Sequence, residues 1–185
     1  VDWQPHLAYV RELGEDGARA FLDRIDFHSL NVRGDGGERF ADLAQSLADP
    51  HDRRRLADYV ALYQHTVGTR IEGSWALLDR LKAREVPVHA ITNWSAETWP
   101  EGLKAQPRLA DAFGVTVVSG QEGIMKPDRR IFDILCDRAG VSPADCVFID
   151  DGLHNVEGAK AAGMDAVHFT GADALERALI ARGLL

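Results

Sequence analysis

Two adjacent carboxylates follow a short apolar run in the last quarter of the sequence. Asp150 and Asp151 come directly after Cys146-Val-Phe-Ile149, and Gly152 follows them. Neighbouring carboxylates repel each other when both are ionised, and the usual reason to keep both charged is a hard divalent cation with oxygen ligands. The pair therefore indicates a metal site, which Mg²⁺ suits best. An equally open alternative is that one aspartate caps the next helix while the other faces water.

Side chains able to contact an anion occur at two earlier positions. Thr92 and Asn93 end the run from Val86 to Ile91 with a hydroxyl and an amide, which can both donate hydrogen bonds. Taken alone, Thr-Asn after a strand is also ordinary turn chemistry. Lys126 precedes Pro127-Asp128, which is typical of a helix start, so its ammonium can face back toward an anion. For a single lysine, an exposed loop position is the competing interpretation.

The elements that must position these residues differ in the two parts of the chain. Apolar residues recur every three or four positions up to about residue 70, which predicts amphipathic helices broken at Gly14, at Gly34–Gly37 and at Asp49-Pro50. After residue 70, helices alternate with short β-branched runs, which is typical of an α/β fold with a Rossmann-like parallel sheet. We expect a helical cap over residues 1–70 and an α/β core over residues 71–185.

Ligands of open parallel sheets lie beyond the carboxyl ends of the strands. Thr92-Asn93 and Asp150-Asp151 both occupy such ends, so we expect them at one edge of one sheet. The seven histidines lack metal-ligand spacing, and only His154 falls near this edge, as a rim residue. Substrate-rim or plain packing roles are open for five further residues: Trp3, His28, Asn31, Trp94 and Trp99.

Composition narrows the class of protein. A formal net charge of -8 over 185 residues argues against nonspecific nucleic-acid binding, which needs a basic footprint. No stretch is long and apolar enough to span a bilayer, so we expect no membrane partner and a cytoplasmic protein. Cys136 and Cys146 are interpreted as small buried hydrophobes in a reducing compartment. Nothing in the sequence predicts the oligomeric state.

Taken together, three motifs resemble those of the haloacid dehalogenase superfamily in order and spacing. They are Ile91-Thr92-Asn93, Lys126-Pro127-Asp128, and Phe148-Ile149-Asp150-Asp151 followed by Asn155 and Gly163-Met164. The resemblance covers residues 70 to 170 in detail, and the helical first part is similar to the small cap of such enzymes. It implies a covalent aspartyl intermediate that water hydrolyses. It also implies that Thr92 and Asn93 contact the substrate, Lys126 neutralises charge, and Asp150 and Asp151 hold Mg²⁺.

The family's nucleophile is an aspartate at the tip of a first strand, which the resemblance places upstream of Val1. Asp2 follows no apolar strand, so we do not assign it that role. We therefore expect the first core strand, between those ending at Thr92 and Asp150, to be absent from these residues. A gap there leaves unpaired backbone on both neighbours. If the 185 residues were the whole protein, we would expect no hydrolase turnover.

Within the family, the carboxylates at Asp150 and Asp151 favour a phosphatase acting on a small phosphorylated metabolite, because phosphatases use them for Mg²⁺. The alternative is a 2-haloacid dehalogenase, which attacks a neutral carbon and tends to carry serine and asparagine there. A non-catalytic binding protein with the same fold is a third hypothesis.

Overall fold

The computed structural model describes residues 1–185 as two compact units. The first unit comprises Val1–Arg70, Asn93–Asp111 and Val118–Gly123, and the second comprises Ile71–Thr92, Ala112–Val117 and Ile124–Leu185. The first unit thus contains all of residues 1–70 together with two later segments. That it serves as a cap stays a prediction.

The chain is mostly helical, with four short strands. Its elements, in order, are η1 (Pro5–Ala8), α1 (Val10–Arg24), α2 (Phe27–Asp35), α3 (Phe40–Gln45), α4 (Pro50–Leu62), η2 (Tyr63–Thr66), α5 (Glu72–Ala83), β1 (Ala90–Thr92), α6 (Trp99–Ala105), η3 (Pro107–Ala110), β2 (Thr116–Val118), α7 (Ser119–Glu122), α8 (Arg129–Ala139), η4 (Pro143–Asp145), β3 (Val147–Asp150), α9 (Leu153–Ala161), β4 (Asp165–His168) and α10 (Ala172–Ile180).

The helices of the first unit pack around aromatic side chains. Tyr59 of α4 is fully buried. Its ring centroid lies 4.9–6.3 Å from those of four other aromatic side chains: Tyr9, Phe27, Phe40 and Tyr63. Offset and edge-to-face ring pairs of this kind add to the stabilisation from apolar burial. The first unit therefore has a core of its own.

The predicted helix breaks in this unit are confirmed. Gly14 has φ 70° and ψ 173° and interrupts α1 with a conformation outside the helical region. α2 ends at Asp35, within the glycine-rich stretch. Asp49 caps α4 by accepting hydrogen bonds from the backbone nitrogens of His51 (2.7 Å) and Asp52 (3.1 Å), and Pro50 occupies the first helical turn.

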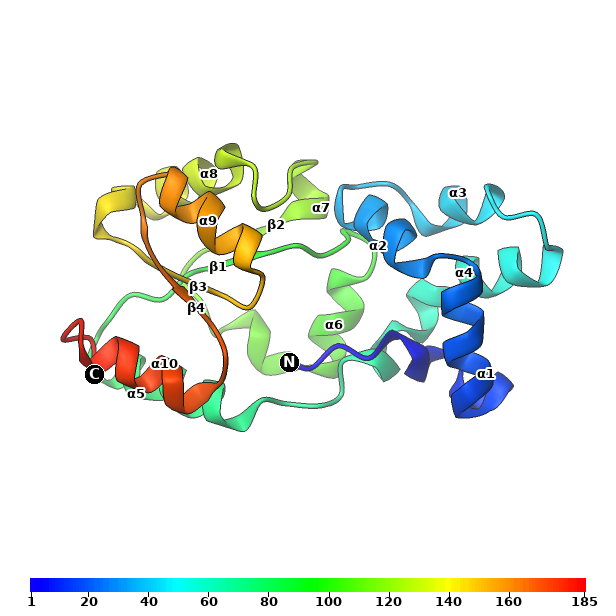
Figure 1. Cartoon of the computed structure of the whole chain (residues 1–185), viewed down its shortest axis with the longest axis horizontal. Helices are drawn as coiled ribbons and strands as arrows, with labels where there is room; N and C mark the ends of the chain where they lie inside the picture. Colours follow the sequence, from blue (N-terminus) through cyan, green and yellow to red (C-terminus); the bar gives the residue numbers. More distant parts are fainter. The chain divides into compact units, whose positions relative to one another are not determined.

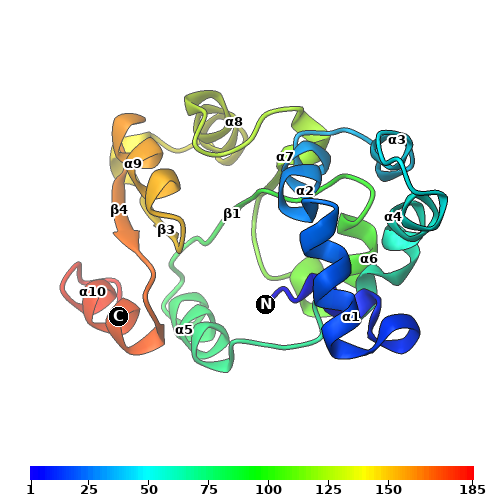
Figure 2. The same ribbon diagram turned by 45° about the vertical axis from the view of Figure 1, so that its right-hand side comes forward.

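The second unit has strands between two helical layers, with α8 and α9 on one side and α5 and α10 on the other (Figures 1 and 2). Successive residues of β3 alternate between the layers, as the two-residue period of a strand requires. Phe148 packs with the buried residues of α8 and α9, and Ile149 packs with those of α5 and α10. The predicted α/β alternation of this half is therefore confirmed.

The strands form two separate two-stranded sheets, not one continuous sheet. β3 pairs with β4 in parallel, with Asp150 opposite His168, while β1 pairs with β2. The apolar run Cys146–Ile149 predicts a buried strand, but the strand comprises Val147–Asp150 and each of its residues is only partly buried. The reason is that β3 has a hydrogen-bonded neighbour on one edge alone.

Cys136 is buried as predicted, whereas Cys146 is only partly buried, and both thiols are free. Burial raises the pKa of the Cys136 thiol to about 11. None of the helices has the length and apolar character that crossing a membrane requires.

Candidate active site

Lys126 and Asp150 meet at the end of β3. Lys126 Nζ lies 2.6 Å from Asp150 Oδ2, and the two side chains are only 9% and 7% exposed. The same ammonium donates to the carbonyl oxygen of Ile91 at 3.1 Å, one residue before Thr92. Lys126 thereby joins the ends of β1 and β3, which are not paired with each other.

The other oxygen of Asp150 is also occupied. Oδ1 accepts hydrogen bonds from the backbone nitrogen of Gly152 (2.8 Å) and from Asn155 Nδ2 (2.9 Å). Burial of the Asp150 carboxyl acts to raise its pKa, but the charge of Lys126 and the hydrogen bonds from these donors outweigh it and hold the pKa below its usual range. Asp150 is therefore ionised at neutral pH.

Gly152 makes this geometry possible. A Cβ at this position would lie 2.9 Å from Asn155 Nδ2 and 3.1 Å from Asp150 Oδ1. Because real Cβ atoms tolerate such contacts poorly, a larger residue would push the carboxylate or its amide donor away. A glycine is therefore needed at position 152, because the side chains of Asp150 and Asn155 come too close to leave room for a Cβ.

Asp151 differs from its neighbour because it is exposed. Its backbone carbonyl interacts with His168 Nε2 of β4 at 2.9 Å. No group of three or more His, Cys, Asp or Glu side chains converges in the chain. Mg²⁺ usually takes only one or two protein carboxylates and keeps several waters. An exposed Asp151 beside a fully hydrogen-bonded Asp150 is compatible with that mode, and the magnesium-binding role of these residues stays a prediction.

Thr92 is the last residue of β1, and Asn93 opens the next segment of the first unit. The structure thus places Thr92, Lys126 and Asp150 in one unit, linked through the Lys126 contact to Ile91. The substrate-contacting and catalytic roles of these residues stay predictions.

Two contacts at or next to Lys126 were not predicted from the sequence. Lys126 Nζ lies 5.7 Å from the ring centroid of Phe148, a cation–π distance. Gly158 of α9 packs so closely on Pro127 that a Cβ would lie 2.6 Å from Pro127 Cβ and 2.8 Å from its carbonyl oxygen. A glycine inside an apolar helical pattern is a weak sign of such contact.

The candidate rim residues have packing or hydrogen-bond contacts or are exposed, and their contact with substrate stays a prediction. Trp94 and Trp99 form an edge-to-face pair with centroids 5.0 Å apart, and Trp3 Nε1 donates to Tyr59 Oη at 3.2 Å. Asn31 Nδ2 donates to Asp35 Oδ2 at 3.0 Å. His28 and His154 are exposed.

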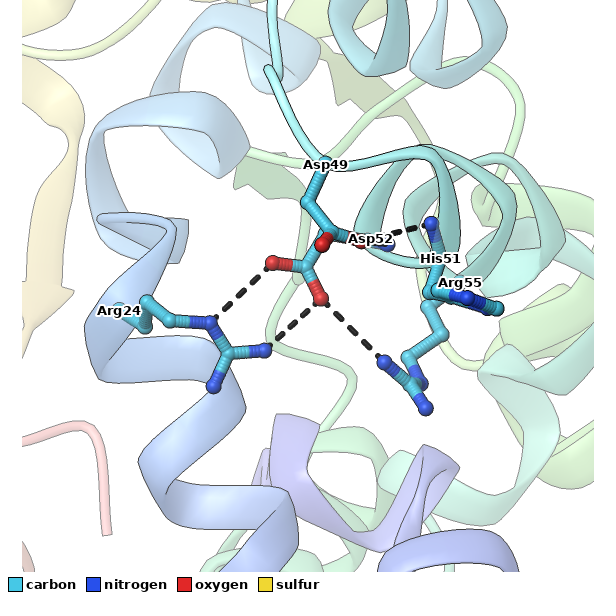
Figure 3. Close-up of a pocket in the computed structure, with 5 residues that line it drawn as sticks. All are labelled: Arg24, Asp49, His51, Asp52 and Arg55. Carbon is cyan, nitrogen blue, oxygen red and sulfur yellow. Dashed lines mark hydrogen bonds and ion pairs between the residues drawn. The ribbon is translucent and has the colours of Figure 1, made fainter.

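The first unit holds a separate surface pocket of about 470 Å³, lined by Arg24, Asp49, His51, Asp52 and Arg55 (Figure 3). Asp52 is buried at its base, accepting from Arg24 at 2.8 and 3.2 Å and from Arg55 at 3.3 Å. Since its guanidinium groups face carboxylates of the chain itself, the pocket is an internal ion-pair network. It contains none of the predicted site residues.

Residues 4–163 match the family model for haloacid dehalogenase-like hydrolases. The chain belongs to this family. The motif resemblance seen in the sequence is therefore confirmed at the level of the superfamily.

Similar curated proteins of this family are phosphatases. Flavin mononucleotide hydrolase 1 of Arabidopsis thaliana is 32% identical over 114 residues, which cover 62% of this chain and 46% of that protein. N-acylneuraminate-9-phosphatase of Mus musculus is 32% identical over 122 residues, covering 62% and 48%. The chain spans about half the length of these curated relatives.

Solved structures share the fold at lower identity. A haloacid dehalogenase family enzyme from Bacteroides thetaiotaomicron, crystallised with magnesium, superposes with a TM-score of 0.61 at 21% identity, covering 79% of this chain and 77% of that one. A dehalogenase structure superposes with a TM-score of 0.68 at 23% identity, covering 91% and 80%. At these identities the likeness shows the fold alone.

Proposed function

We propose that this haloacid dehalogenase-like hydrolase is a magnesium-dependent phosphomonoester phosphatase that acts on a small phosphorylated metabolite. The observation that carries the proposal is the Lys126–Asp150 pair, which fixes a positive charge between the ends of β1 and β3. Phosphoryl transfer depends mostly on positioning and on stabilising charge at the phosphoryl oxygens. The phosphatase relatives support the same reaction class.

In this proposal each polar residue has one task. Lys126 neutralises charge on the transferring group, and Asp150 keeps the ammonium in place through its 2.6 Å contact. Both oxygens of Asp150 already have donors, so Asp151 is the carboxylate assigned to Mg²⁺. The Thr92 hydroxyl hydrogen-bonds a phosphoryl oxygen, and Asn93 contacts the substrate. Bound Mg²⁺ would supply positive charge to the phosphoryl oxygens and the nucleophile.

The proposed nucleophile is an aspartate at the tip of a further strand, N-terminal to Val1. Its carboxylate attacks phosphorus, the ester oxygen leaves with a proton, and water then hydrolyses the aspartyl phosphate to regenerate the carboxylate and release inorganic phosphate. The separate sheets β1–β2 and β3–β4, with β3 only partly buried, support a strand pairing between β1 and β3.

The test is hydrolysis of p-nitrophenyl phosphate by the polypeptide extended N-terminally to include that strand. We expect turnover with Mg²⁺, none after chelation with EDTA, and recovery when Mg²⁺ is restored. Lys126→Gln should lower kcat by about two to three orders of magnitude, because it removes charge stabilisation in the transition state. Lys160→Gln, which removes an exposed lysine paired with Glu157, is the matched control.

Two results would overturn the proposal. Release of chloride from 2-chloropropionate without metal would make the protein a dehalogenase. Absence of hydrolysis across a broad panel of phosphate esters, in a folded extended chain, would make it a non-catalytic member of the family.

A further inference from the structure

Asp35, the last residue of α2, is a partly buried residue whose carboxyl group has uncharged hydrogen-bond partners. Asn31 Nδ2 donates to its Oδ2 at 3.0 Å, and the backbone N–H of Ser95 donates to the same carboxyl group. Burial raises the pKa of Asp35 to about 7, and these two hydrogen bonds only partly offset the effect. Burying a carboxyl group costs free energy unless hydrogen bonds offset the loss of water.

The backbone of Asp35 reaches the same segment as its side chain. Ser119 Oγ donates to the Asp35 carbonyl oxygen at 2.6 Å and accepts from the Trp94 backbone nitrogen at 2.9 Å. Ser119 is fully buried, so water does not compete for these hydrogen bonds. Asp35 is therefore tied to Trp94 through Ser119 and to Ser95 directly.

The segment that Asp35 contacts, residues 94–96, also packs closely against Gly120 of α7. Gly120 N donates to Trp94 O at 3.1 Å, and a Cβ at Gly120 would lie 2.4 Å from Ala96 N. No side chain fits between α7 and residues 94–96. Asp35 and α7 together therefore hold this segment.

Residues 94–96 follow Thr92 and Asn93 directly in the chain. We infer that Asp35 is a positioning residue: it anchors Trp94 and Ser95 and so fixes the backbone that carries Asn93 in the same unit. The anchoring stands on the contacts of the first unit alone, whereas its consequence for catalysis rests on the proposed function.

Asp35 faces groups from every element around it. They are Asn31 on α2, Tyr59 on α4, Tyr63 on η2, Ser95 on the anchored segment and Ser119 on α7. Only the two tyrosines among them can ionise, and burial raises the pKa of each well above the ordinary value. Neither tyrosine therefore titrates between pH 5 and 8.

Amide hydrogen exchange of the 185-residue chain tests the anchoring. In Asp35→Ala, exchange of the Ser95 amide should rise at least about tenfold, because its acceptor is lost. Asp35→Asn keeps an acceptor oxygen and should restore most of the protection. Asp42→Asn, at an exposed position of α3, is the control and should leave the amide unchanged.

The amides of Leu43 and Leu56, in the core of the same unit, report general destabilisation. If their exchange in Asp35→Ala rises as much as that of Ser95, Asp35 is merely structural and the inference fails. It fails equally if the Ser95 amide does not respond.

A second measurement separates the inference from the proposed function. In the extended polypeptide, Asp35→Ala should lower kcat for p-nitrophenyl phosphate at least about tenfold, with recovery in Asp35→Asn. If the exchange results hold but the wild type shows no hydrolysis, the anchoring stands and the proposed function fails. If the wild type hydrolyses and Asp35→Ala retains its full kcat, positioning of Asn93 by Asp35 is disproved.

Discussion

The ammonium of Lys126 lies 2.6 Å from Asp150 Oδ2 and 3.1 Å from the carbonyl oxygen of Ile91, so one side chain joins the ends of two strands that belong to different sheets. Both members of the ion pair are nearly buried. A buried charge that loses its partner is strongly destabilising, whereas removal of both charges costs less. This contact therefore matters for stability as well as for the proposed chemistry.

Lys126→Gln should lower the free energy of unfolding by about 3 kcal/mol, because Asp150 is left without its counter-ion. Adding Asp150→Asn should recover part of that loss, since neither charge is then unpaired. Urea denaturation of the two single variants and the double variant gives the coupling energy. Lys160→Gln should change stability by less than about 0.5 kcal/mol. Additive effects at Lys126 and Asp150 would show that the two side chains do not interact.

Gly158→Ala tests how closely the backbone around Lys126 is packed. The new Cβ would lie 2.6 Å from Pro127 Cβ and 2.8 Å from Pro127 O, so the loop or α9 must shift. We expect a loss of about 1–3 kcal/mol in the free energy of unfolding. Gly68→Ala is the control, because a Cβ there meets nothing within 4 Å. Equal stability of both variants in urea would refute the close contact.

Asp52→Ala tests the ion-pair network of Figure 3. It removes the buried carboxylate that Arg24 and Arg55 share, and Arg55 is only 17% exposed. The expected loss is about 1–3 kcal/mol, since Arg24 can return to water. Asp58→Ala, on an exposed face of the same helix, should be near neutral. A neutral Asp52→Ala would show that these ion pairs do not stabilise the chain.

The pKa of Asp35 predicts a pH dependence of stability. Its carboxyl has a pKa of about 7 in the folded chain against an ordinary value of 3.8, so the folded state binds the proton more tightly. This contribution is fully present below pH 3.8 and is lost as the pH rises toward 7. Between pH 5 and 8 the Tm of the wild type should therefore fall more than that of Asp35→Asn. The Tm of Asp42→Asn should follow the wild type, and parallel curves for all three would contradict the assignment.

Lys126 and Asp150 could be predicted as site residues because the sequence signals for both are local. Asp150 ends an apolar run, and Lys126 precedes a Pro-Asp helix start. The expectation that the ends at Thr92 and Asp150 share one sheet was wrong, because β1 and β3 belong to separate sheets. Asp128 indeed caps α8, accepting from the backbone nitrogen of Arg130 at 2.9 Å. The sequence did not reveal that protein donors fill both oxygens of Asp150, because Asn155 and Gly152 approach it only after the turn into α9 has formed.

Asp35 escaped prediction for a different reason. It lies in a glycine-rich stretch that predicts a helix connection, and nothing in that local pattern indicates contact with Ser95 or Ser119. Those contacts join residues about 60 and 84 positions away, so only tertiary packing creates them. The strand ending at Thr92 was also predicted too long. The apolar run begins at Val86 but β1 comprises only Ala90–Thr92, and Pro87 has no backbone N–H to donate to a neighbouring strand.

Asp151→Asn tests the assignment of the metal-binding carboxylate. Mg²⁺ is held by oxygen ligands with negative charge, and an amide in place of the exposed carboxylate keeps the shape but removes that charge. Calorimetric titration of the N-terminally extended polypeptide with MgCl₂ should show affinity reduced at least about tenfold relative to the extended wild type. Asp173→Asn, an exposed aspartate of α10, is the charge-matched control and should bind as the wild type does. Equal losses in both variants would show that Mg²⁺ is attracted by net charge alone, and unchanged affinity in Asp151→Asn would remove Asp151 from the magnesium site.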